Sequence, residues 1–377
     1  MAPSTSNVQS STSLDYASTE AIRRLAQLHL HQSLRLHVPQ TIAQESLRVT
    51  FATTSNFDQH DLPVILFLGP MFGTRYNAST FDRLARATKV RCICVDRPGF
   101  GGSTPVPVNH RVQVWLETVP LLLKRLKVKR VALVSHSAGT VYCLNTLFHH
   151  RDFLSPSAPY VALLAPWVHS EHSKMAMTTV LSKPPTGMLS SWSNIVGFIN
   201  QRVAPTASWS GGVLSDVSKL FQAESQATSS RDMQDKYGDE EVGTEIEKLQ
   251  SKYMFAESMA GGNDEARLCL KSNGDGLMGV CENYQQYVKE LSEQERERRG
   301  QSATEAKLQV SIHFAGSDIM IGKGGKDYFE NCWALASEDV IEVSSTEYPG
   351  TNHDSVLIDF EKGALRGIFE AVASSYH

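Results

Sequence analysis

The chain has 377 residues, of which 41% are hydrophobic and 20% are charged, a composition that indicates a globular protein long enough to bury a large core. The formal net charge is -4 at pH 7, and Lys and Arg are scattered without forming a basic stripe, which argues against nucleic acid as a partner. No apolar stretch of the sequence is long enough to cross a bilayer.

The spacing of the cysteines and the composition of the first residues indicate in which cellular compartment the protein is expected. The six cysteines show no Cys-x-x-Cys spacing, which predicts buried free thiols rather than disulfide bonds or a zinc site. The first residues are rich in Ser and Thr and lack the charged and apolar regions of a secretory signal. We therefore expect a disordered tail over residues 1–14 and, by default, a cytoplasmic location.

Short apolar strands then alternate with helices. Apolar spacing predicts a helix over residues 15–36, and alternation predicts a strand from Ser46 to Thr53. Continuous apolar runs, typical of strands buried on both faces of a parallel sheet, occupy residues 63–69, 90–96, 130–135 and 160–168. Helical patterns separate these runs at residues 77–88, 112–126 and 138–150. The alternation indicates βαβ units.

The alternation stops after Val168. About 140 residues follow before the next convincing strand, far more than an ordinary loop contains. The segment from His169 to Val203 holds many apolar residues, with Met175, Met177, Met188 and Trp192 among them. Residues 222–245 are polar and predicted to be flexible, and a helix is predicted over residues 282–299. We interpret the insertion as a helical lid with a flexible segment, whose apolar residues form at least the core that any lid needs.

The strand and helix pattern resumes near the end of the chain. Strands are predicted over residues 308–316 and 340–349, with a helix over residues 326–336 between them. A single amphipathic helix is predicted to close the chain over residues 353–375.

The strand that ends at Ser135 leads into the sequence Ser-His-Ser-Ala-Gly. Ser137 lies between this strand and the next helix, and the small residues Ser135 and Gly139 flank it two positions away on either side. Small residues are needed there because a nucleophile elbow is a strained and tightly packed turn. Such a turn holds the hydroxyl at the carboxyl edge of the sheet, where open α/β folds bind ligands.

A serine hydroxyl needs a base, and the base needs a carboxylate. His353 follows the last predicted strand and can take the proton of Ser137. Asp318 follows the strand before it and can fix the tautomer of that histidine. The structural alternatives are a turn without chemistry at Ser137 and a capping role for Asp318.

Two further motifs complete a resemblance to a known family. Residues 96–103 read DRPGFGGS and closely resemble the D-x-P-G-x-G-x-S turn of the α/β-hydrolase family, and residues 65–76 resemble the family's oxyanion loop. With the order Ser137, Asp318, His353, the chain is similar to the lidded form of this family. The resemblance implies an α/β fold with a mostly parallel central sheet flanked by helices and a large helical lid inserted after the sixth strand. Residues 15–168 and 306–377 would form the core, and residues 169–305 the lid.

The resemblance also implies an oxyanion hole made by the backbone N–H groups of Met71 and Ala138. Two positions depart from the family pattern: the elbow reads S-x-S-x-G, and the usual His-Gly of the oxyanion loop is Gly69-Pro70. Serine is small enough for the elbow, and the proline, which has no N–H, precedes the expected donor. Asp96 and Arg97 are expected to brace the loops after their strand through a salt bridge or hydrogen bonds.

Together these residues predict a serine hydrolase that cleaves a carboxylic ester or thioester of an apolar small molecule through an acyl-enzyme, without a metal or an organic cofactor. The same triad could instead serve acyl transfer, lactone opening or C–C bond hydrolysis. A hydrolase-like binding protein that has lost its chemistry is a third alternative. An epoxide hydrolase or a haloalkane dehalogenase is not expected, because those relatives use aspartate as the nucleophile. The oligomeric state does not follow from the sequence.

Overall fold

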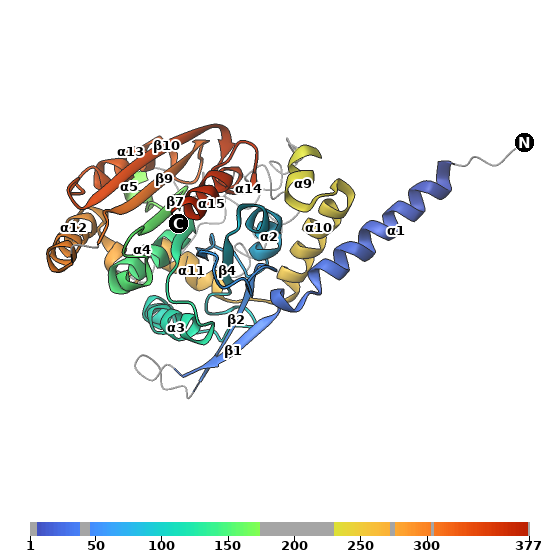
Figure 1. Ribbon diagram of the computed structural model, residues 1–377, viewed down its shortest axis with the longest axis horizontal. Coiled ribbons are helices and arrows are strands. Elements are labelled where there is room, and N and C mark those ends of the chain that lie inside the picture. Colours follow the sequence, from blue (N-terminus) through green and yellow to red (C-terminus); the bar gives the residue numbers. More distant parts are fainter. Residues whose placement is uncertain (1–5, 38–45, 174–229, 272–275, 303–304, 376–377) are drawn as a thin grey trace, which may run out of the picture.

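The computed structural model describes residues 6–37, 46–173, 230–271, 276–302 and 305–375. An eight-stranded sheet with the order β1-β2-β4-β3-β6-β7-β9-β10 runs through its centre (Figure 1). The strands are β1 (Gln32–Leu36), β2 (Leu47–Thr53), β3 (Val64–Leu68), β4 (Arg91–Val95), β6 (Ala132–His136), β7 (Tyr160–Leu164), β9 (Leu308–Ser317) and β10 (Ile341–Asn352). Only β2 pairs antiparallel, with β1 and β4, so the predicted mostly parallel sheet is confirmed.

Helices connect the strands and cover the sheet. They are α1 (Ser6–Leu25), α2 (Asn77–Thr88), α3 (Arg111–Arg125), α4 (Gly139–His149), α5 (Ser170–Ser173), α9 (Ser230–Tyr237), α10 (Glu240–Ala256), α11 (Gly261–Cys269), α12 (Tyr284–Gln301), α13 (Gly322–Trp333), α14 (Ser355–Ile358) and α15 (Leu365–Ser374). A second, two-stranded sheet pairs β5 (Phe100–Gly101) with β8 (Ser258–Met259). Among the described helices, none has the length and apolar character needed to span a membrane.

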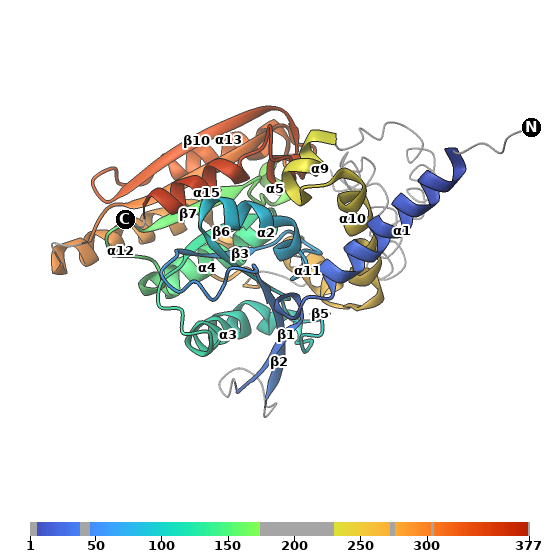
Figure 2. The same cartoon turned by 45° about the vertical axis from the view of Figure 1, so that its right-hand side comes forward.

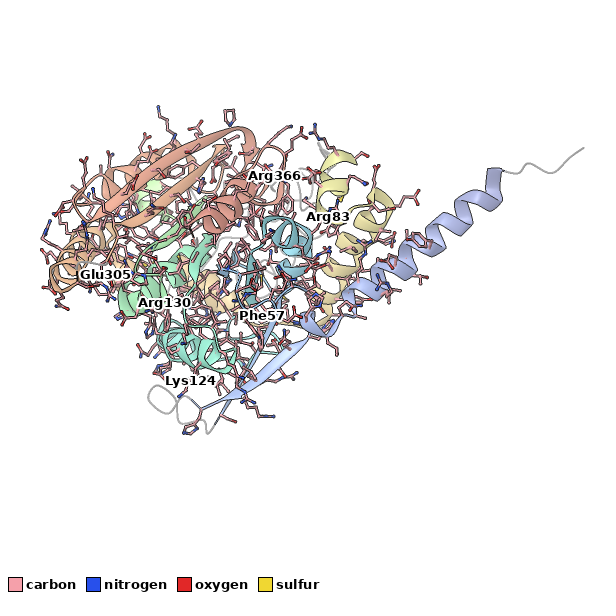
Figure 3. All side chains as sticks on the ribbon, viewed as in Figure 1. Phe57, Arg83, Lys124, Arg130, Glu305 and Arg366 are labelled. Atoms are coloured by element: carbon pink, nitrogen blue, oxygen red, sulfur yellow. The ribbon has the colours of Figure 1, made fainter. Side chains whose placement is uncertain are left out.

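The two faces of the large sheet carry separate hydrophobic cores. Because successive strand residues point to opposite faces, Leu66 and Leu68 pack into one core while Ile65 and Phe67 pack into the other. Helices α3, α4, α12 and α13 cover the first face, and α1, α2, α14 and α15 cover the second (Figures 1 and 2). Side chains fill the space between these layers, with exposed charged residues such as Lys124 at the rim (Figure 3). Burial on both faces explains the continuous apolar runs of the central strands.

The N-terminal segment differs from its predicted form. Helix α1 begins at Ser6, so residues 6–14 are helical and do not belong to the disordered tail expected there. The segment from Ser4 to Val38 contains neither Gly nor Pro, and nothing in it stops a helix from starting early. The helix ends at Leu25 instead of continuing to residue 36, because Leu34 and Leu36 alternate on β1, which pairs with β2.

The inserted segment lies between β7 and β9, and its described part is largely helical. Helix α12 agrees with the helix predicted over residues 282–299. Of the polar segment predicted to be flexible, residues 222–229 lie outside the described residues. Residues 230–245 contain α9 and the start of α10, where the Asp239 side chain accepts a hydrogen bond from the Val242 N–H and caps the helix. The polar residues of this part therefore cap a helix and form the solvent-exposed faces of α9 and α10. The apolar segment predicted for residues 169–203 lies outside the described residues from residue 174 onward.

The closing helix is divided in two. Helices α14 and α15 are separated by residues 359–364. The Asp359 carboxylate accepts hydrogen bonds from the N–H groups of Glu361 and Lys362, which forms a turn in place of continued helix. An ideal Cβ on Gly363 would lie 2.5 Å from the carbonyl oxygen of Asp359, so the tight turn needs glycine there.

Candidate active site

The three predicted catalytic residues lie at one edge of the sheet. Each follows the last residue of a strand: Ser137 follows β6, Asp318 follows β9, and His353 follows β10. Since β6, β7, β9 and β10 run parallel, their carboxyl ends meet at the same edge. The fold thus brings together side chains that are far apart in the sequence.

These three side chains form a continuous hydrogen-bonded chain. The Ser137 Oγ lies 2.8 Å from the His353 Nε2, and the His353 Nδ1 lies 2.8 Å from the Asp318 Oδ2. Because an ionised carboxylate can only accept, Nδ1–H is the donor to Asp318, and Nε2 is left to accept from the serine hydroxyl. Ser137 and His353 are 5% and 3% exposed, so little water competes for these bonds.

The charges of the site stabilise a protonated histidine. Burial lowers the pKa of His353, but the adjacent carboxylate of Asp318 outweighs it and holds that pKa above its usual value. Burial raises the pKa of Asp318, but the His353 imidazole and the backbone N–H groups of Met320 and Ile321 have a larger, opposite effect. The pKa of Asp318 therefore lies below its usual value. Asp318 is therefore ionised at neutral pH and can stabilise an imidazolium.

The turn at Ser137 has the strained backbone expected of a nucleophile elbow. Ser137 has a φ of 53°, in the left-handed region that side chains disfavour. An ideal Cβ on Gly139 would lie 2.0 Å from the carbonyl oxygen of Leu68, so only glycine fits there. Ser135 is fully buried between β3 and β7. The elbow therefore forms with serine at a position where the family pattern has glycine.

The two expected oxyanion donors lie on loops that touch each other. Ala138 directly precedes α4, and Gly139 packs so closely that its ideal Cβ would lie 2.6 Å from the carbonyl oxygen of Gly69, in the loop that carries Met71. Within the described residues, neither the Met71 nor the Ala138 backbone N–H donates a hydrogen bond. Both N–H groups can thus donate a hydrogen bond to a ligand, and their oxyanion role stays a prediction.

One contact of the site, made by His136, was not predicted from the sequence, in which this residue either lines the pocket or packs half-exposed after its strand. His136 is 1% exposed, and its Nε2 lies 2.7 Å from the backbone carbonyl oxygen of His353. A carbonyl only accepts, so His136 donates from Nε2. Burial and the proximity of His353 lower the pKa of His136 to about 3, so it is neutral at pH 7. No sequence signal identifies this contact, because it joins a side chain to a backbone atom of a distant loop.

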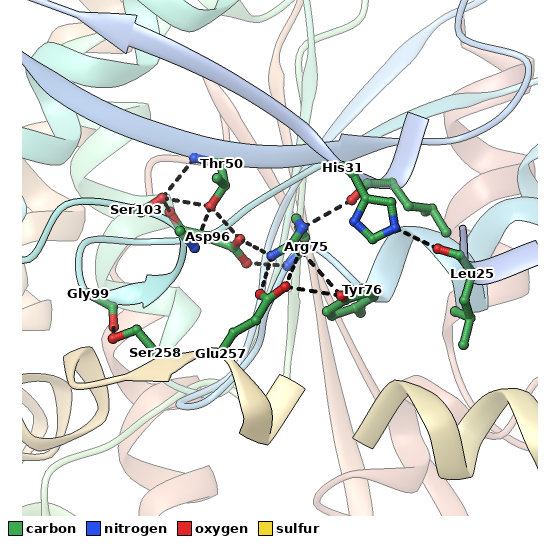
Figure 4. Close-up of polar contacts among 12 residues, drawn as sticks. Leu25, His31, Thr50, Arg75, Tyr76, Asp96, Gly99, Ser103, Glu257 and Ser258 are labelled. Carbon is green, nitrogen blue, oxygen red and sulfur yellow. Dashed lines mark hydrogen bonds and ion pairs between the residues drawn. The ribbon is translucent and has the colours of Figure 1, made fainter. Parts of the chain in front are cut away.

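Asp96 braces the loops after β3 and β4, as predicted (Figure 4). Its carboxylate lies 2.8 Å from the Arg75 guanidinium and accepts hydrogen bonds from the Arg75 N–H at 2.7 Å and from the Thr50 hydroxyl at 2.6 Å. Glu257, from the insertion, accepts two further hydrogen bonds from Arg75. This network ties the loop after β4 to the start of α2 and to the inserted segment.

The cysteines are free and buried, as expected. Cys92 and Cys94 lie on the same face of β4, with their sulfur atoms 3.9 Å apart. In the ranges the structure describes, no three His, Cys, Asp or Glu side chains are arranged to hold a metal ion.

Comparison with known proteins agrees with this architecture. The sequence profile of the alpha/beta hydrolase family matches residues 65–260, more than half of the chain. The matched segment contains the oxyanion loop, the DRPGFGGS turn and the nucleophile elbow. No curated protein sequence matches the chain.

Solved structures align with most of the chain at low sequence identity. The protein Rv0554 from Mycobacterium tuberculosis is 10% identical, with a TM-score of 0.50 over 91% of this chain and 99% of that chain. A carboxylesterase structure from Nitrososphaera gargenis is 11% identical, with a TM-score of 0.49 over 90% of this chain and 99% of that chain. The epoxide hydrolase VrEH1 from Vigna radiata is 15% identical, with a TM-score of 0.49 over 93% and 98%. On its sequence profile, the chain belongs to the alpha/beta hydrolase family.

Proposed function

We propose that this protein is a serine hydrolase that cleaves a carboxylic ester or thioester, with Ser137 as the nucleophile. The observation that carries the proposal is the pair of 2.8 Å hydrogen bonds that link Ser137 to His353 and His353 to Asp318. A serine hydroxyl is a weak nucleophile until a base removes its proton. In this proposal His353 is that base, and the Asp318 carboxylate holds it in the required tautomer.

The reaction follows from these positions. The Ser137 oxygen attacks the substrate carbonyl carbon while the His353 Nε2 takes the hydroxyl proton. The negative oxygen of the tetrahedral intermediate accepts hydrogen bonds from the N–H groups of Met71 and Ala138, each lowering the barrier by ~3 kcal/mol. His353 then gives its proton to the leaving alcohol or thiol as the carbonyl bond to it breaks. Water, deprotonated by His353, then attacks the acyl-enzyme carbonyl carbon. The bond to the Ser137 oxygen breaks, His353 returns the proton to that oxygen, and the acid is released.

We extend the proposal to the insertion, residues 169–305, as a lid on a core formed by residues 15–168 and 306–377. Support comes from its return segment, in which β8 pairs with β5 and Gly262 packs against Phe72 beside the oxyanion loop. Met71, an apolar residue on that loop, is only half-buried, which favours an apolar acyl group in a small-molecule substrate.

The nature of the nucleophile separates this proposal from related chemistries. Epoxide hydrolases and haloalkane dehalogenases of this fold use aspartate, and position 137 is serine. Acyl transfer would use the same acyl-enzyme with an alcohol in place of water. Offering alcohols in competition with water to a trapped acyl-enzyme distinguishes transfer from hydrolysis.

The test compares Ser137→Ala with the parent protein and with Ser292→Ala, which removes the hydroxyl of a buried serine on α12. We expect the parent and the Ser292→Ala variant to hydrolyse a short p-nitrophenyl ester and to react with a fluorophosphonate. Ser137→Ala should lose both activities and remain folded. Turnover by Ser137→Ala at the parent rate would contradict the proposal.

A further inference from the structure

A buried arginine holds the loop that carries Met71. Arg97, which is 1% exposed, donates hydrogen bonds to two consecutive carbonyl oxygens, from Nη1 to Gly69 at 2.9 Å and from Nη2 to Pro70 at 2.6 Å. The Gly73 N–H also donates to the Pro70 oxygen, at 2.8 Å. The carbonyl just before Met71 therefore has two donors that fix its direction.

This carbonyl and the Met71 N–H belong to one peptide group. A trans peptide is planar, and its C=O and N–H point in opposite directions. The chain has no cis peptide bond among its described residues. When Arg97 and Gly73 hold the Pro70 oxygen on one side of the loop, the Met71 N–H must point to the other side. The orientation of one expected oxyanion donor is thus determined by the two hydrogen bonds that the Pro70 oxygen accepts, from Arg97 and from the Gly73 N–H.

Arg97 is held in turn by a carboxylate from the insertion. Glu265, on α11, accepts from the Arg97 Nε at 2.5 Å and from its Nη2 at 2.8 Å, and also from the Arg111 Nη2 at 3.1 Å. Both Arg97 and Glu265 are 1% exposed. Burial raises the pKa of Glu265, but the charges of Arg97 and Arg111 hold it below its usual value. Without this carboxylate, Arg97 would keep an uncompensated buried charge, which is strongly destabilising.

Close packing fixes α11 against the same loops. The Gly261 N–H donates to the Gly99 carbonyl at 3.0 Å. An ideal Cβ on Gly262 would lie 2.2 Å from the ring of Phe72, the residue after Met71. Glycine at both positions of α11 therefore lets the helix approach the oxyanion loop closely enough for Glu265 to reach Arg97.

We infer that Arg97 and Glu265 are positioning residues that set the direction of the Met71 N–H, so that the oxyanion hole is complete only while α11 lies against the loop. This inference rests on the proposed function. It links the insertion to the reaction step itself, in addition to its proposed role in covering the substrate. Loss of either residue should impair stabilisation of the oxyanion more than substrate binding.

The test uses Glu265→Gln and Arg97→Lys, with Glu295→Gln as the matched control. Glu295 forms a similar buried pair, in which Arg151 donates from Nε at 2.6 Å and from Nη2 at 3.0 Å, and it also joins the insertion to the core. That pair contacts neither the oxyanion loop nor the triad. All three variants are expected to lower Tm, but only the first two should affect the reaction.

For Glu265→Gln and Arg97→Lys we expect kcat on a p-nitrophenyl ester to fall on the order of 100-fold with little change in KM. Affinity for a trifluoromethyl ketone, which forms a negatively charged hemiketal on the serine, should fall in parallel. Glu295→Gln should retain the parent kcat and the parent affinity. If Glu265→Gln does not fold, the Arg97→Lys variant decides. Lysine keeps the charge that pairs with Glu265 but lacks the planar guanidinium whose Nη1 and Nη2 reach the Gly69 and Pro70 carbonyls.

The outcomes separate this inference from the proposed function. If the parent is labelled at Ser137 and both variants keep its kcat and ketone affinity, the inference is overturned and the proposed function stands. If all three variants lose activity equally, the effect comes from burial of a broken ion pair, and the inference is again overturned. If the parent itself is not labelled at Ser137, the proposed function fails and the inference fails with it.

Discussion

His136 donates a hydrogen bond to the backbone carbonyl of His353, at 2.7 Å, from the position directly before Ser137. The strand that leads into Ser137, the proposed nucleophile, therefore also holds the loop of His353, the proposed base. The two imidazole rings lie 5.2 Å apart, and both are buried. Motion of the His353 loop relative to Ser137 is restrained from within the elbow.

Replacing His136 by Phe should lower kcat about 10-fold, because the His353 carbonyl loses its buried donor and the loop of the base loses its restraint. His136→Gln, which keeps an N–H donor of similar reach, should retain more of the activity. Steady-state kinetics on a p-nitrophenyl ester would measure both. Equal activity of His136→Phe and the parent would show that this bond does not position the base.

Asp318→Asn should reduce kcat on the order of 10⁴-fold, because an amide no longer selects the tautomer in which Nε2 accepts. The pH profile should also move. His353 acts as a base only when neutral, so activity falls as pH drops through its pKa. Asp318 holds that pKa above its usual value, so the acid limb of kcat/KM should shift to lower pH in the variant.

Asp354→Asn is the matched control for this prediction. Asp354 is the neighbour of His353 in sequence and is buried, but within the described residues its side chain makes no hydrogen bond to the imidazole. The variant should keep its kcat within an order of magnitude. A loss as large as that of Asp318→Asn would mean that the carboxylate partner has been assigned to the wrong residue.

Gly139→Ala should destabilise the protein by about 3 kcal/mol or more, because the new methyl group would meet the Leu68 carbonyl at 2.0 Å. Gly367→Ala should instead stabilise the protein by roughly 0.5–1 kcal/mol, because nothing lies within 4 Å of an added Cβ on α15. Urea unfolding would compare the two variants. A Gly139→Ala protein of parental stability would contradict the tight elbow.

Because His313 is buried, we expect the free energy of unfolding to fall at acidic pH. Burial lowers its pKa to about 4, while an unfolded histidine titrates near its usual value of about 6.5. Below that value the unfolded state binds a proton that the native state does not, so stability is lost as pH falls from about 6.5 towards 4. One such group removes roughly 2 kcal/mol of unfolding free energy between pH 7 and pH 5.

His313→Gln should remove this contribution. Urea unfolding at pH 7 and pH 5 should show a smaller loss for His313→Gln than for the parent. His313 also bonds to Tyr348 and Ser311, so the variant can be less stable at both pH values, and only the difference between them is diagnostic. An equal loss in both proteins would place the acid sensitivity elsewhere, His136 included.

The sequence predicted the parallel strands well, because burial on both faces leaves continuous apolar runs such as Val64–Leu68. It missed β1, a short edge strand with exposed residues, since half-buried strands give a weak pattern next to a helix. The turn between α14 and α15 was also missed, because in the sequence Asp359 is indistinguishable from the polar residues of an amphipathic helix.

The candidate site could be predicted only where residue type and strand ends carry the signal. Ser137, Asp318 and His353 each follow a strand, and the fold places them together. The contacts of His136 with the His353 carbonyl and of Glu265 with Arg97 join segments 217 and 168 residues apart. No local sequence pattern predicts such a pairing. In the sequence, Glu265 is indistinguishable from an ordinary helix residue, and only the position of α11 against the loop identifies its role.

The most direct test of the account is the rate at which a fluorophosphonate labels the parent and the His353→Ala variant, with the modified peptide identified by mass spectrometry. The account predicts modification of the parent at Ser137 and labelling of His353→Ala slower on the order of 10⁴-fold, because the hydroxyl has lost its base. Labelling at another residue, or an equal rate in the two proteins, would contradict it.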